Sequence, residues 1–247
     1  MFTSRLLACS VLLVSVGACA HTPSPTKFES AANKAIPGEF DLIQTRVYRD
    51  GPYAVFEHSV RYGAGALKPN AIGQLAGSEV FSYVWPTSLN SSAVGFAAAQ
   101  GILAFVLTAH PDFDDTPKFD ENADGKFDND GDLWHSHWVV LTPDEQCGPG
   151  ALKVKDIPAD AHPNLPATWP GLPLFIDSPG YEPELKGEQV RARVPLKDIG
   201  FPEAFQYDGV TAALRVNANV HSPLLCVTNV WDVTSGDLSL PATYAPQ

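Results

Sequence analysis

The 247-residue chain has few basic residues. It contains 16 lysines and arginines against 28 aspartates and glutamates, and its net charge is −12. This deficit argues against a nucleic-acid partner, because neutralising phosphates requires lysine and arginine. Charged residues make up 18% of the chain, which is too little for a coiled coil, while the 45% of hydrophobic residues is too much for a disordered chain. The composition therefore indicates a globular protein, and the length suits one domain.

Long helical patterns are also missing. The 22 prolines are spread along the chain and interrupt helices, so we expect at most a short helix over Ser91–Gln100. Period-two alternation and short apolar runs predict strands instead. We expect an all-β domain over residues 35–247, a single antiparallel β-sandwich of jelly-roll type with one long acidic loop. The expected strands are Phe40–Arg49, Tyr53–Tyr62, Glu79–Trp85, Ile102–Thr108, Leu133–Leu141, Leu172–Ile176, Gln189–Val194, Val210–Val216 and Leu224–Val233.

The first 18 residues have the features of a secretory signal peptide. Arg5 precedes an apolar run of 11 residues, which is too short to span a bilayer. The run ends in Val16-Gly17-Ala18-Cys19, which resembles a bacterial lipobox. The resemblance implies cleavage before Cys19, a lipid anchor on Cys19, and, because alanine follows, the outer membrane of a Gram-negative cell, facing the periplasm or the exterior. The alternative is an ordinary secreted protein. Residues 19–34 are expected to form a flexible tether.

Only two cysteines remain once Cys9 leaves with the signal peptide and Cys19 carries lipid. Cys147 and Cys226 would then lie in an oxidising compartment, where two remaining thiols usually pair. We therefore expect a disulfide between them. A metal site or a reactive pair is the alternative, although neither cysteine lies in a CxxC motif.

The segment from Asp112 to Asp132 carries nine acidic residues and two lysines. Ca²⁺ binds six to eight hard oxygen ligands, and alternate positions of a tightly turning loop supply them. The order of residues from Asp120 to Asp128 fits the first nine positions of an EF-hand-type calcium loop, with Lys126 contributing its carbonyl group. The expected ligands are Asp120, Asn122, Asp124, Lys126 and Asp128.

The calcium pattern departs from an EF-hand at its twelfth position, where Gly131 replaces the usual glutamate. Asp130 or Asp132 would have to substitute. The segment is similar to the calcium loops of dockerins and thrombospondin repeats. Asp112 and Asp114 would form a second site or the other wall of the first. The alternative is a solvated acidic loop with Asx-turns.

Three histidines form a second candidate site. His135 and His137 are two residues apart on an expected strand, so their side chains share a face. His110 ends the preceding apolar strand, and a hairpin would bring it close to them. With Asp112 or Asp114, these side chains could bind Zn²⁺ or Cu²⁺. The alternative is a set of histidines that form hydrogen bonds on a polar face.

Two segments resemble DOMON and family-nine carbohydrate-binding sandwiches. They are Asp41–Val60 and Gln189–Gly200, and the second contains a "PLxxIG" phrase at the end of a late strand. The resemblance implies a ligand-binding sandwich, in some members for sugar or haem. Met1 is the single methionine and leaves with the signal peptide, which excludes haem ligation by a methionine and a histidine.

The sequence thus predicts a membrane-anchored binding lipoprotein with calcium and, on the histidine face, zinc or copper. No catalytic residue is assigned. One alternative is a metal-dependent hydrolase that uses His110, His135 and His137, with Asp112 orienting water. The other is a carbohydrate-binding module whose exposed aromatic side chains stack on sugar rings.

Overall fold

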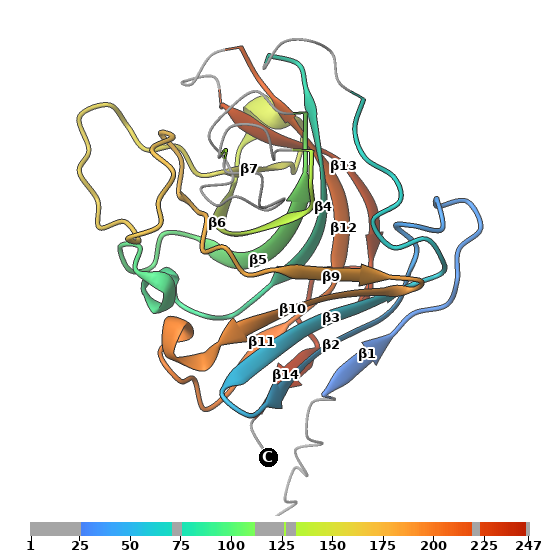
Figure 1. The fold of residues 1–247 in the computed structure, drawn as a ribbon. Coiled ribbons are helices and arrows are strands. Elements are labelled where there is room, and N and C mark those ends of the chain that lie inside the picture. Colours follow the sequence, from blue (N-terminus) through green and yellow to red (C-terminus); the bar gives the residue numbers. More distant parts are fainter. Residues whose placement is uncertain (1–25, 71–75, 112–125, 127–131, 219–222, 246–247) are drawn as a thin grey trace, which may run out of the picture.

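The computed structural model describes residues 26–70, 76–111, 126, 132–218 and 223–245. The described chain is all-β, with antiparallel pairing throughout (Figure 1). One sheet has five strands, and its first strand, β1, lies in the segment predicted as a tether. Its strands in spatial order are β1 (Lys27–Glu29), β2 (Leu42–Asp50), β3 (Tyr53–Val60), β10 (Gln189–Pro195) and β9 (Pro183–Lys186).

A second sheet closes on itself. Six strands follow one another around it, and β5 pairs with β6 to complete a barrel. β8 (Ile176–Asp177) adds to β6, and β11 (Phe205–Tyr207) pairs with β14 (Ala242–Tyr244) in a separate two-stranded sheet. The barrel strands in order are β5 (Ile102–Ala109), β4 (Glu79–Pro86), β12 (Val210–Val216), β13 (Leu225–Val233), β7 (Leu152–Val154) and β6 (His135–Pro143).

The all-β prediction is confirmed, but the prediction of one simple sandwich is wrong. The protein is a six-stranded barrel with two further sheets. Alternation shows which side chains share a face, but it does not show which strands pair. The apolar run of β5 is buried on both faces from Leu103 onwards. Phe105 packs against the five-stranded sheet, whereas Val106 belongs to the core inside the barrel.

Aromatic side chains join the five-stranded sheet to the barrel. Phe56 of β3 packs against Phe105 of β5, with ring centroids 4.9 Å apart, and against Trp85 of β4 at 5.9 Å. Trp138 of β6 lies 5.1 Å from Phe105. All four side chains are fully buried, and aromatic pairs of this kind contribute about 0.5–1.5 kcal/mol each beyond their area burial.

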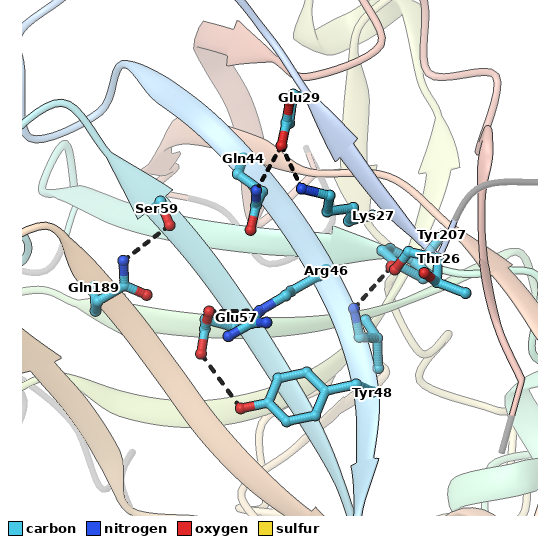
Figure 2. A network of polar contacts seen from close by, with 11 residues as sticks. Thr26, Lys27, Glu29, Gln44, Arg46, Tyr48, Glu57, Ser59, Gln189 and Tyr207 are labelled. Atoms are coloured by element: carbon cyan, nitrogen blue, oxygen red, sulfur yellow. Dashed lines mark hydrogen bonds and ion pairs between the residues drawn. The ribbon is translucent and has the colours of Figure 1, made fainter. Parts of the chain in front are cut away.

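The other face of the five-stranded sheet is polar. Figure 2 shows Glu57 between two side chains of β2: the Arg46 Nε donates to its carboxylate at 2.7 Å, and the Tyr48 hydroxyl lies 3.4 Å from it. Gln44, two residues before Arg46, donates to Glu29 of β1. This alternation of polar and apolar residues explains why β2 and β3 were recognisable from the sequence.

Helical structure among the described residues is limited to three short 3₁₀ turns. They are η1 (Ser91–Val94), η2 (Glu145–Cys147) and η3 (Leu196–Ile199). The helix expected over Ser91–Gln100 is therefore a single turn. Asn90 caps its start by accepting a hydrogen bond from the Ser92 amide, and Gly95 ends it at φ 98°. None of the described helices has the length and hydropathy needed to cross a bilayer.

The predicted disulfide is confirmed, and it reinforces the weakest part of the barrel. Cys147 in η2 is bonded to Cys226 in β13. β7, which lies between β6 and β13, has three residues, and only the pair Lys153 and Cys226 is in register with β13. The bond therefore holds β13 to the β6–β7 connection at the point where few backbone hydrogen bonds do so.

Replacing both cysteines, in the variant Cys147→Ser/Cys226→Ser, is expected to lower the free energy of unfolding by about 4 kcal/mol. The crosslink joins residues 79 positions apart, and the chain-entropy model gives roughly this value for such a loop. Urea unfolding of the oxidised protein and the variant measures the difference. A loss below about 1 kcal/mol would show that the remaining barrel contacts close the sheet without the disulfide.

Candidate functional site

The inside of the barrel contains a cavity of about 210 Å³. Its wall is formed by alternate residues of each strand, because strand side chains point to opposite faces in turn. Most of these residues are valine, leucine, isoleucine or alanine, so the cavity is apolar along most of its length. Central wall residues are Val84, Val106, Val139, Leu141, Val154, Leu174, Val210, Ala212 and Leu214.

The stagger of the strands explains how six strands enclose such a space. Paired residues around the barrel connect Thr142 of β6 through Lys153, Cys226 and Arg215 to Glu79 at the start of β4. Following the β4–β5 and β5–β6 pairings onward from Glu79 leads back to β6 about ten residues before Thr142. One circuit of the barrel therefore shifts the register by about ten residues. Steeply tilted strands each occupy more of the circumference, which widens the barrel.

Two bulges keep β13 facing the cavity. The inward residues are Val227, Val230 and Val233, which are three positions apart rather than two. The register of β13 against β12 shifts twice, and each extra residue restores the inward direction of the next valine. One of the extra residues, Trp231, packs outside the barrel, stacked on Phe40 at 4.1 Å.

The two ends of the cavity differ. At one end, the exposed apolar side chains of Ile102, Val230 and Leu238 line the opening. Leu238 and Leu240 both adopt positive φ angles, 59° and 53°, which are unfavourable for leucine and persist only where the surroundings impose them. The first end is therefore an apolar opening.

The other end of the cavity holds the predicted histidine cluster. β5 and β6 pair as the expected hairpin, with Thr108 opposite His135. The ring centroids of His110 and His135 are 5.0 Å apart, and those of His135 and His137 are 4.8 Å apart, with rings nearly perpendicular in each pair. The prediction that the three histidines lie together is confirmed. Trp138 takes the opposite face of β6.

Backbone carbonyl groups orient all three rings. The Nδ1 atoms of His110, His135 and His137 lie 2.9, 2.8 and 3.0 Å from the carbonyl oxygens of Pro111, Leu133 and Asp177. A carbonyl oxygen only accepts, so each Nδ1 carries the proton and donates it.

His135 is held in its neutral form. Burial lowers the pKa of His135 well below its ordinary value, and the neighbouring His137 and His110 lower it further. Because the ring donates through Nδ1, its Nε2 accepts from the Thr108 hydroxyl at 3.2 Å.

The described residues give no support to a metal centre. They contain no group of three or more histidine, cysteine, aspartate or glutamate side chains that could hold a metal ion. Zinc or copper binding by the histidines therefore stays a prediction. Asp132, one expected calcium ligand, lies on the surface with its carboxylate 3.8 Å from the Lys68 ammonium, and Lys126 is also exposed. Other predicted residues lie outside the described chain: Cys19, Asp112, Asp114, Asp120, Asn122, Asp124, Asp128 and Asp130.

Calcium binding by the acidic segment is directly testable. Calcium at a hundredfold excess over its dissociation constant is expected to raise the free energy of unfolding by about 2.7 kcal/mol, because it binds the folded state. Asp124→Asn should abolish this rise, whereas Asp160→Asn, at an exposed position elsewhere, should retain it. Thermal melts with calcium and with chelator measure the effect. An equal response of wild type and Asp124→Asn would contradict the assignment.

A fourth histidine lies in the core, away from the cluster. His58 of β3 is fully buried and stacks on Trp85 with ring centroids 3.9 Å apart. Its Nε2 lies 3.3 Å from the Val84 carbonyl oxygen, while its Nδ1 has no hydrogen-bond partner. Burial lowers the pKa of His58 to about 3, although the Val84 carbonyl opposes this shift.

His58 is expected to make the fold sensitive to acid. The unfolded chain binds a proton near pH 6.5 and the folded protein only near pH 3, so the stabilisation is present above pH 6.5 and is lost as pH falls towards 3. In His58→Leu, the fall in unfolding free energy from pH 6.5 to pH 5 should be about 2 kcal/mol smaller than in wild type. Urea unfolding at the two pH values measures this, with His162→Leu, at an exposed position, as control. Parallel pH profiles would contradict it.

Comparison of the chain with models of protein families, with curated proteins and with solved structures finds no match. The "PLxxIG" phrase, on which the resemblance to sugar-binding sandwiches rests, lies where β10 ends and η3 begins. There Gly200 adopts φ 72° and closes the turn. Any function must therefore be argued from the geometry of this chain.

Sequence reasoning located the histidines but missed the rest of the site. Ser82 and Thr108 line the cavity beside the histidines, and Ala212 lies in the wall next to Ser82. The available signal was a polar residue at an inward position of an apolar strand, as Thr108 is in the run from Ile102. That signal becomes informative only once the structure shows that this face of the strand lines a cavity.

Proposed function

We propose that this protein binds a small apolar molecule inside its barrel. The observation that carries the proposal is the cavity of about 210 Å³ with an apolar wall. An apolar cavity of about 150 Å³ holds benzene, so this one suits a ligand with about eight to ten carbon atoms. Burying such a ligand contributes roughly 0.8 kcal/mol per methylene group.

The composition of the wall supports a binding role over a structural one. A six-stranded barrel that only needed stability would be filled by its own side chains. Here inward positions such as Val84, Val106 and Ala212 carry small side chains, which leave the centre open. The exposed apolar end at Ile102 and Leu238 provides an entrance that matches an apolar ligand.

The proposed ligand accounts for the structure better than the alternatives. A metal-dependent hydrolase needs converging metal ligands, and the described residues hold no such group. A sugar-binding face needs accessible aromatic rings, but Tyr48 and Tyr53 on the five-stranded sheet lie beneath the guanidinium groups of Arg46 and Arg193, at 4.5 and 4.7 Å. If Cys19 carries lipid as proposed from the sequence, the binding protein works at a membrane surface.

Filling the cavity should abolish binding without unfolding the protein. Ala212→Phe places a ring in the central space, and we expect affinity for 1-octanol to fall at least tenfold. The unfolding free energy should change by less than about 1.5 kcal/mol, because the new ring occupies existing volume. Isothermal titration with 1-octanol and urea unfolding measure the two quantities.

The same change on the surface provides the control. Ala35 is exposed, so Ala35→Phe should bind 1-octanol as wild type does. If Ala212→Phe is folded and retains full affinity, the ligand binds elsewhere and the cavity is not the site. If wild type binds no octanol, the proposed function itself is wrong for ligands of this class.

A further inference from the structure

The connection between β13 and β14 lies at the apolar opening of the cavity. Two of its residues, Leu238 and Leu240, line the cavity together with Ile102 and Val230. Leu238 is 41% exposed, so its side chain lies at the boundary between the cavity and water. The residues from 236 to 239 are all exposed. The segment 236–241 is called the strap below.

Both ends of the strap are fixed to one short stretch of chain, residues 207–209, where β11 leads into β12. Before the strap, the Thr234 amide donates to the Gly209 carbonyl oxygen at 2.8 Å, and the Ser235 hydroxyl donates to the Asp208 carboxylate. After the strap, Ala242 of β14 pairs with Tyr207 of β11. The strap is therefore a short surface loop with neighbouring, anchored ends, which can move without disturbing the barrel strands.

The middle of the strap is bound mainly to its own side chains. The Ser235 hydroxyl oxygen accepts from the amides of Asp237 and Leu238, at 3.3 and 3.0 Å. The Asp237 carboxylate accepts from the Ser239 amide at 3.0 Å. Because the Ser235 hydroxyl also donates to Asp208, which is fully buried, one hydroxyl group connects these amides to the barrel. Exposed segments that are attached in so few places open at a low free-energy cost.

The backbone of the strap is in an unfavourable conformation. Leu238 and Leu240 have φ angles of 59° and 53°, in the left-handed region where a Cβ atom meets the following carbonyl oxygen. Covering the apolar opening with two leucine side chains opposes this cost. Lifting the strap would expose the side chains and release the backbone, so the two effects offset each other. Such conformations cluster at ligand clamps and switch regions.

We propose that the strap is a gate, which lifts from the opening to admit the apolar ligand and closes over it, and that Ser235 is the latch of the closed position. The inference rests on the proposed function, and it assigns control of ligand entry and release to this segment. Weakening the latch should therefore speed both entry and release. The affinity should change little, because it depends mainly on the cavity wall.

The latch is tested by removing one hydroxyl group. Ser235 is not among the residues that line the cavity, so Ser235→Ala leaves the wall intact. The probe is an octanol with a terminal trifluoromethyl group, and fluorine NMR of the full-length protein measures its exchange between free and bound states. Association and dissociation rates should both rise about fivefold, which corresponds to the loss of one hydrogen bond, while the dissociation constant stays within about twofold.

Ser92→Ala is the matched control. The Ser92 hydroxyl also forms a hydrogen bond within a turn, to Asn90, but Ser92 lies in η1 and does not line the cavity. This variant should exchange the probe at the wild-type rates.

A second measurement needs no variant. Amide hydrogen exchange of Asp237 and Leu238 reports opening of the strap in the wild type. The fluorinated octanol, at a hundredfold excess over its dissociation constant, should slow this exchange about tenfold or more, because it favours the closed strap. The Gln146 amide is the control, since it also donates to a nearby side chain, that of Asp144, but lies in η2. Its exchange should not change.

The possible results separate the two proposals. If the probe binds but exchanges at the same rates in Ser235→Ala as in wild type, or if it leaves the exchange of the strap amides unchanged, the gate is overturned while binding in the cavity stands. If the wild type does not bind the probe, the proposed function fails, and the gate fails with it.

Discussion

The hydrogen-bonded pairing of β5 with β6 is the constraint on which the rest of the structure depends. It turns an open sheet into a barrel, so that one face of each strand surrounds a closed space and the other packs outward. The same pairing places Thr108 beside His135 and brings His110 to the rim. Without it, Val106 and Val139 would lie on an exposed face, and the apolar surface they bury could not stabilise the fold.

The sequence predicted the strands well and the architecture less well. β10 was recognised because its polar and apolar residues alternate regularly, and the disulfide because only two cysteines remained to pair. The barrel was not predictable, because closure depends on which strands meet across long connections. The segment Leu172–Ile176 shows a further limit. Leu172, Leu174 and Ile176 belong to the barrel interior, yet only Ile176 forms part of a strand, β8.

The candidate site, like the fold, was predictable only in part. His135 and His137 were found because a spacing of two residues is a local property, and the strand geometry turns it directly into a shared face. The cavity was missed because a wall of valines has the same sequence pattern as a packed core. β13 adds a second reason, since its bulges separate Val227, Val230 and Val233 by three residues and remove the period that marks an inward face.

The arrangement of protons distinguishes between the possible roles of the histidine cluster. Metal-binding histidines also donate Nδ1 to backbone carbonyl groups, so the orientation of the rings is compatible with either role. His135, however, accepts a hydrogen bond from Thr108 through the atom that a metal would need. Displacing that hydroxyl would leave two buried polar groups to find new partners. His135 thus orients the buried Thr108 hydroxyl at this end of the cavity.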